Sequence, residues 1–167
     1  MTLKTKQELS AGSVVFKKLN NVPLYALGKH SAYYKWVLPK GLIEKGEDKL
    51  SAAVRETEEE LNLKVKPISQ KPIYVAKYTY LADFKGKIEN SRRVAKYQES
   101  GGSKSKVEKT VYFFLAEYIS GDIKKHGWEM SDAGWFEYAK ARKLLAFDDE
   151  KKTLEQAYKL IKPNILT

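Results

Sequence analysis

Residues 41–63 carry the sequence GLIEKGEDKLSAAVRETEEELNL, and this stretch decides the expected fold. Its second half, residues 48–61, has the periodicity of a helix, because mostly apolar side chains recur at i, i+3, i+4, i+7 and i+11. These positions are Leu50, Ala53, Val54, Thr57 and Leu61. Asp48 is the expected N-cap, and Asn62 is the expected left-handed residue that ends the helix. The stretch therefore predicts a loop followed by a capped helix.

Three glutamates share one side of this helix, next to its apolar face. Glu56, Glu59 and Glu60 stand at i, i+3 and i+4, so their carboxylates are neighbours and repel one another. A bound cation would turn that repulsion into attraction. Oxygen ligands without His or Cys suit Mg²⁺ or Mn²⁺ better than zinc. For a glutamate triplet alone, a solvated acidic helix face is the commoner explanation.

The spacing of six residues decides between these two interpretations. They match, in type and spacing, the signature of the Nudix hydrolases. This chain resembles that family from about residue 11 to residue 162. The matching residues are Gly41, Glu47, Arg55, Glu56, Glu59 and Glu60. Thr57 stands where the signature has an aliphatic residue, and Asn62 stands where it has glycine. Neither change removes a metal ligand, so both bear on stability more than on activity.

The resemblance implies a metal-dependent attack of water on the phosphorus of a diphosphate bond. Mg²⁺, or Mn²⁺, would be held by the Gly41 carbonyl and by the carboxylates of Glu56, Glu59 and Glu60. Glu47 and Arg55 would tie the loop to the helix, with Arg55 orienting a catalytic carboxylate. The proton acceptor would be Glu59, Glu60 or a carboxylate from a distant loop.

Two flanking segments resemble one branch of this family, the dinucleoside polyphosphate hydrolases and their relatives that act on diphosphoinositol polyphosphates. In residues 36–41, WVLPKG, Lys40 would sit beside the metal site and hold a phosphate. In residues 128–131, WEMS, Glu129 would be a further metal ligand or the catalytic base. The alternatives are a surface lysine and a solvated loop acid.

A third segment, residues 109–115 with the sequence KTVYFFL, resembles the later strand of the same branch. The resemblance implies that Lys109 points at the polyphosphate and that Tyr112 lines a base pocket. Alternating tyrosines at 74, 78 and 80 would more commonly form aromatic pairs across a sheet than a stacking pocket.

The rest of the chain predicts strands mixed with helices. We expect strands at residues 11–18, 24–28, 63–65, 73–80 and 110–118, a turn at Asn20–Asn21, a loop at 40–47, and helices at 138–147 and 150–162. Residues 85–106, with seven basic and two acidic side chains, predict a long basic loop. This is an α/β or α+β pattern in one domain, residues 1–167. The resemblance implies an α/β/α sandwich around a mixed β-sheet.

The composition of the chain indicates which binding partners and kinds of site to expect. The 167 residues carry a net charge of +10, which favours polyanionic partners such as nucleotides or RNA. The absence of cysteine excludes disulfides, thiolate metal sites and cysteine nucleophiles. There is neither a membrane-spanning apolar run nor a signal peptide at the N-terminus, so we expect a cytoplasmic protein without a membrane partner.

Three functions remain open on the sequence. The first is hydrolysis of a dinucleoside polyphosphate or similar nucleotide, favoured by the complete signature together with Lys40 and Lys109. The second is removal of pyrophosphate from RNA 5′ ends, with the basic loop following the backbone. The third is a non-catalytic nucleotide- or RNA-binding module. The sequence leaves the oligomeric state open.

Overall fold

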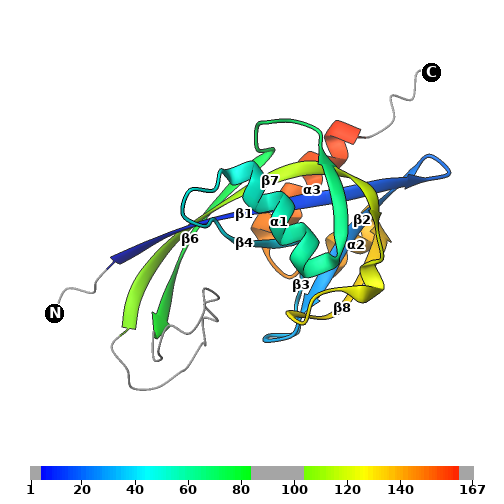
Figure 1. Cartoon of the computed structure of the whole chain (residues 1–167). Helices are drawn as coiled ribbons and strands as arrows, with labels where there is room; N and C mark the ends of the chain where they lie inside the picture. Colours follow the sequence, from blue (N-terminus) through cyan, green and yellow to red (C-terminus); the bar gives the residue numbers. More distant parts are fainter. Residues whose placement is uncertain (1–4, 84–103, 162–167) are drawn as a thin grey trace.

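The computed structural model describes residues 5–83 and 104–161, and within these ranges its framework is a mixed sheet of eight strands (Figure 1). The strands are β1 (Thr5–Leu19), β2 (Val22–His30), β3 (Trp36–Val37), β4 (Lys40–Leu42), β5 (Leu63–Pro67), β6 (Tyr74–Asp83), β7 (Lys104–Gly121) and β8 (Met130–Glu137). The helices are α1 (Lys49–Leu61), α2 (Tyr138–Leu144), α3 (Asp148–Ile161) and the short 3₁₀ helix η1 (Ile123–Lys125).

β1 and β7 form the centre of the sheet and run parallel to each other. On its other edge β1 pairs antiparallel with β4 through residues 10–12 and with β2 through residues 16–19. β7 pairs antiparallel with β6 over its first half and with β5 over its second half. β2 also pairs antiparallel with β3 and with β8. β4 is thus a three-residue strand inserted beside the middle of β1, and it holds residues 40–42 in the sheet.

Helices cover both faces of the sheet, as the alternation along β1 demonstrates. Val14 and Phe16 point into a core shared with buried residues of α2 and α3. Ala11 and Val15 point the other way, into clusters that include buried residues of α1. Because successive strand residues face opposite sides, α1 lies on one face and α2 and α3 on the other (Figure 1). The predicted α/β/α sandwich around a mixed sheet is confirmed.

Several local predictions are also confirmed. Asn20 and Asn21 both have positive φ, 51° and 66°, as a tight two-residue hairpin turn with the twist of its strands requires. The predicted helix of residues 48–61 is α1, capped by Asp48 and ended by Asn62 in the left-handed conformation. β1 and β7 are longer than predicted, beginning at Thr5 and Lys104. None of the helices in the described ranges is long and apolar enough to cross a bilayer.

Two loop predictions need correction. The expected loop at 40–47 begins as β4, because Lys40–Leu42 pairs with residues 10–12 of β1. The expected basic loop at 85–106 ends too late, because residues 104–106 already belong to β7, which pairs with β6 and β1. Residues 84–103 of that prediction lie outside the described residues. The strand β8 has no counterpart among the sequence predictions.

Candidate active site

α1 presents its glutamates at different depths. Asp48 caps the helix by accepting a hydrogen bond from the Ser51 backbone N–H at 2.9 Å. Glu56 and Glu60 are buried, with 9% and 5% of their surface exposed, whereas Glu59 is exposed. Burying a carboxylate costs free energy unless the group is paired, so two buried carboxylates on one helix indicate a candidate functional site.

Gly41 in β4 makes room for the Glu56 carboxylate. Gly41 pairs with Ala11 on the α1 face of the sheet, where the Glu56 side chain reaches it. A Cβ added to Gly41 would overlap the Cδ and both carboxylate oxygens of Glu56. The glycine is therefore required by this close approach. The glycine lets the backbone of β4 and the Glu56 carboxylate lie close together, and these are two of the predicted metal-ligating groups.

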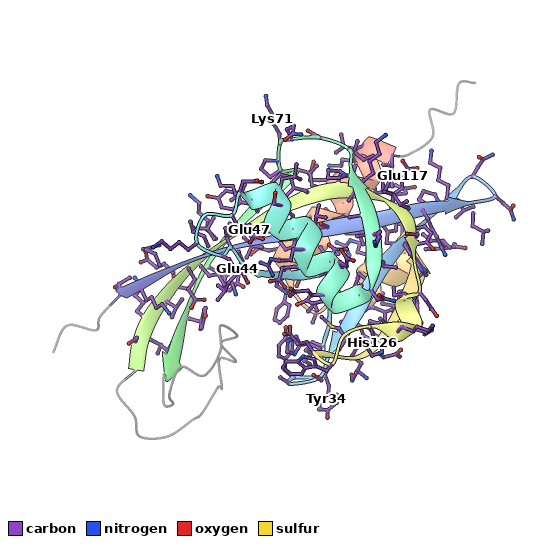
Figure 2. All side chains as sticks on the ribbon, viewed as in Figure 1. Tyr34, Glu44, Glu47, Lys71, Glu117 and His126 are labelled. Carbon is purple, nitrogen blue, oxygen red and sulfur yellow. The ribbon has the colours of Figure 1, made fainter. Side chains whose placement is uncertain are left out.

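Arg55 ties the loop after β4 to the helix. Its Nε and Nη2 donate to the two carboxylate oxygens of Glu47 at 2.7 and 2.9 Å, and Nη2 also donates to the Leu42 carbonyl at 3.0 Å. Nη1 donates to Glu56 Oε1 at 2.7 Å. Glu47 lies beside the first turn of α1 (Figure 2). This geometry supports the predicted linking role of Glu47 and Arg55, and it holds the Glu56 carboxylate in one orientation.

The Glu47–Arg55 pair predicts a dependence of stability on pH. Hydrogen bonds from Arg55 hold the pKa of Glu47 below its ordinary value. The stabilisation is therefore present above the ordinary glutamate pKa and is lost as the pH falls through the lowered, folded-state pKa. We expect E47Q to lower Tm by about 3–6 °C at pH 7, and the difference from the parent protein to shrink towards zero near pH ~3. Thermal unfolding followed by circular dichroism at several pH values measures this; a pH-independent difference would contradict it.

Glu60 lies at the junction of α1, β4 and the loop before β8. Its Oε2 accepts a hydrogen bond from the Lys40 backbone N–H at 3.0 Å. Burial raises the pKa of Glu60 well above its ordinary value. The charge on Lys40 opposes this rise, and the charges of Glu56 and Glu129 add to it.

Glu129 lies within electrostatic reach of these carboxylates, although its segment is far along the chain. Its charge contributes to the raised pKa values of both Glu56 and Glu60. The Glu129 carbonyl accepts hydrogen bonds from the N–H and the Oγ of Ser31, each 2.8 Å long. The turn between β2 and β3 therefore fixes this segment next to the carboxylates.

A divalent cation fits the chemistry of this site, because its donors are carboxylate oxygens. Burial raises the pKa of Glu56 despite Arg55, and the charges of Glu59 and Glu129 raise it further. Within the described part of the chain, no three Asp, Glu, His or Cys side chains are close enough to hold one metal ion. Arg55 contacts Glu56 and Glu59, at 2.7 and 3.4 Å, and Glu60 is turned to Lys40. The carboxylates repel one another, and Arg55 and the Lys40 backbone N–H offset part of this repulsion.

The Lys40 side chain lies on the opposite face of the sheet from Glu56. Lys40 pairs with Gly12 of β1, and a Cβ on Gly12 would lie only 2.7 Å from Lys40 Cβ, so both positions face the α2–α3 side. The ammonium lies 3.7 Å from Glu150 Oε1 in α3. Burial alone would lower the pKa of Lys40, but the facing Glu150 carboxylate holds it above its ordinary value.

Lys109 shares this face with Lys40. Lys109 stands in a row across three strands with Glu8 of β1 and Tyr78 of β6. Burial lowers the pKa of Lys109, and the charge of Lys40 lowers it further. The charges of Glu8, Glu60 and Glu56 act on the pKa of Lys109 in the opposite direction, so this lysine faces carboxylates as well as a second ammonium group. The sequence predicts both lysines as phosphate ligands, and the structure brings them to one face.

Tyr112 lies elsewhere. It packs on the α1 face of the sheet against the cluster of Ala11, Ala52, Ala53 and Phe114, and Lys49 Nζ stands 4.0 Å from the centre of its ring. The structure does not bring Tyr112 together with Lys40 and Lys109, because alternate residues of β7 face opposite sides. Its assignment to a base pocket stays a prediction. The tyrosines of β6 lie on the lysine face, where Tyr80 donates to Glu8 Oε2 at 3.0 Å and Tyr74 donates to Asp149.

The sequence interpretation does not include Glu150. This residue follows two other acidic residues, Asp148 and Asp149, in the first turn of α3, where acids are common because they complement the helix dipole. Only the packing of α3 on the sheet distinguishes it, since Glu150 is 3% exposed and accepts a hydrogen bond from the Leu38 N–H at 2.6 Å. No pattern in the sequence separates this buried acid from its neighbours.

The family follows from a comparison with known proteins. A family model of the NUDIX domain matches residues 14–157, which is most of the chain. The chain therefore belongs to the Nudix family of hydrolases. Among its relatives is a protein described as the putative mutator protein MutT4 of Mycobacterium tuberculosis (strain CDC 1551 / Oshkosh), 25% identical over 165 residues. The match covers 95% of this chain and 58% of that protein, so the chain spans little more than half the length of this relative.

Solved structures share the fold. An Ap4A hydrolase of C. elegans, solved as a binary complex, matches with a TM-score of 0.65 and 23% identity over 92% of this chain and 97% of that one. The MutT protein of Methanosarcina mazei Go1 matches with a TM-score of 0.63 and 17% identity, over 96% and 99%. The NUDIX domain of Shewanella oneidensis NrtR, complexed with ADP ribose, matches with 0.57 and 20%, over 93% and 89%.

Proposed function

We propose that this protein is a metal-dependent pyrophosphohydrolase that cleaves a diphosphate bond in a nucleotide, with a dinucleoside polyphosphate as the substrate class. The proposal rests on one observation: carboxylates lie on one side of β4 and lysine ammonium groups on the other. The buried Glu56 and Glu60 approach β4 from α1, and Lys40 projects from β4 to the other face, where Lys109 lies. Such a site offers carboxylates for a cation on the α1 side of β4 and ammonium groups for phosphates on the other side.

The metal in this proposal is Mg²⁺, with Mn²⁺ as a substitute. Glu56, Glu59, Glu60 and the Gly41 carbonyl would hold it, because they offer oxygen ligands of the kind these ions prefer. When bound, the metal supplies charge neutralisation at the phosphate oxygens and a lower pKa for a coordinated water.

The protein's own groups have separate tasks in this proposal. Lys40 and Lys109 bind phosphate oxygens and fix the position of the chain of phosphates. Arg55 holds the Glu56 carboxylate in place. Glu59, Glu60 or Glu129 accepts the proton of the attacking water.

A long polyphosphate suits the two lysines. Two lysines at different points of the same face of the sheet can contact different phosphates of one chain. The C. elegans hydrolase named for Ap4A, with which this chain shares its fold, is a further reason to test dinucleoside polyphosphates first.

A substrate panel tests the proposal. The purified protein is incubated with Mg²⁺ and with Mn²⁺ against diadenosine polyphosphates, nucleoside triphosphates, ADP ribose, diphosphoinositol polyphosphates and 5′-triphosphorylated RNA, and the products are separated by chromatography. E59Q is the inactive control. Rapid cleavage of a diadenosine polyphosphate, absent in E59Q, is the expected result. Preference for RNA would assign the activity to RNA 5′ ends, and binding without turnover would indicate a non-catalytic module.

A further inference from the structure

Glu150 is a buried acid outside the loop–helix motif of residues 41–63. It belongs to α3, on the face of the sheet opposite α1, and only 3% of its surface is exposed. Its Oε1 accepts a hydrogen bond from the Leu38 backbone N–H at 2.6 Å and lies 3.7 Å from Lys40 Nζ. A single carboxylate oxygen therefore meets both a backbone group and the side chain of the segment that leads into β4.

Burying a carboxylate is costly unless it is paired and hydrogen-bonded, so the contacts of Glu150 are not incidental. Lys40 is itself mostly buried, with 16% of its side chain exposed. Its backbone N–H donates to Glu60 of α1. Lys40 is thus held at its backbone by one helix layer and at its ammonium by the other.

We propose that Glu150 is a positioning residue that holds the Lys40 ammonium on the substrate face of β4, the face it shares with Lys109, where it can bind a phosphate. This inference rests on the proposed function, in which Lys40 contacts the polyphosphate. A lysine side chain is long and flexible, and fixing it in advance removes an ordering cost from substrate binding. Glu150 achieves this without touching the substrate, because its carboxylate is covered.

A purely structural role for Glu150 would be to tether α3 to residue 38. E150Q separates the two roles, because the amide oxygen of glutamine still accepts the Leu38 N–H while the charge facing Lys40 is lost. E155Q is the matched control. Glu155 lies on the same helix and pairs with Arg142 on the surface, away from Lys40.

The test is a double-mutant cycle between E150Q and K40M, measured as KM and kcat for diadenosine tetraphosphate. We expect E150Q to raise KM about tenfold and to change kcat less than about threefold, because uniform binding is lost. In the K40M background E150Q should change KM less than about twofold, since the group it positions is gone. E155Q should match the parent. Equal effects of E150Q in both backgrounds, or an unchanged KM in E150Q, would overturn the inference.

A second measurement separates this inference from the proposed function. The affinity of each variant for inorganic tripolyphosphate is measured by calorimetry in the E59Q background, where turnover plays no part. An affinity about tenfold weaker in E150Q, and dependent on Lys40, supports the inference even if the substrate panel finds another substrate. Equal affinities overturn it even if diadenosine tetraphosphate is hydrolysed. Thermal unfolding confirms that each variant is folded at the temperature of the assay.

Discussion

Replacing Glu56 with glutamine is expected to lower kcat by about 10³-fold, a loss of about 4 kcal/mol of transition-state stabilisation. Glu56 is the buried carboxylate that lies against Gly41 and is oriented by Arg55. Glutamine keeps the shape of the side chain and removes the charge that a metal requires. Steady-state kinetics with Mg²⁺ and the best substrate of the panel measures the loss.

The same variant should be at least as stable as the parent when no divalent cation is present. Burial and neighbouring carboxylates raise the pKa of Glu56, so its ionised form is disfavoured in the folded protein relative to the unfolded chain. Mg²⁺ should raise the Tm of the parent and leave that of E56Q unchanged. E58Q, which replaces an exposed glutamate on the same helix, is the control and should retain full activity. A fully active E56Q would contradict the proposed metal site.

The second large effect is expected at Gly41. The methyl group of alanine would occupy the place of the Glu56 carboxylate, which packs directly against the glycine Cα. Either the carboxylate or β4 must shift, and a displacement of about 1 Å in a catalytic group costs about 10²-fold in rate. We expect G41A to lower kcat/KM by about that factor, measured with the same substrate.

A shortened acid provides the control for this steric argument. Aspartate at position 56 withdraws the carboxylate from Gly41, so G41A should be much less harmful in the E56D background than in the parent protein. Independent, additive losses in the double variant would show that the methyl group acts elsewhere.

Much of the fold can be predicted because local signals and packing agree. Asp48 and Asn62 mark the ends of α1, and both act as predicted. The asparagine pair 20–21 likewise marks the β1–β2 turn. β4 cannot be predicted in this way, because three residues beginning with a lysine carry no strand signal, and only pairing with β1 makes them a strand.

The residues of the site also fall into those that can be predicted from the sequence and those that cannot. The carboxylate cluster of α1 can be predicted from helical spacing, whereas the roles of Arg55 and Gly41 come from the family signature, whose spacing is fixed by one loop and one helix. Lys109 and Glu129 follow only from the resemblance, since their place depends on β7 and on the turn before β8. The face on which Tyr112 lies and the burial of Glu150 depend on tertiary packing, which the sequence pattern does not express.

The most direct test of the central claim is the initial rate of diadenosine tetraphosphate hydrolysis with Mg²⁺ and with a chelator, for the parent protein and for E59Q. We expect asymmetric cleavage that requires the metal and is lost in E59Q. Hydrolysis that continues in the chelator, or that E59Q performs at the rate of the parent, would contradict it.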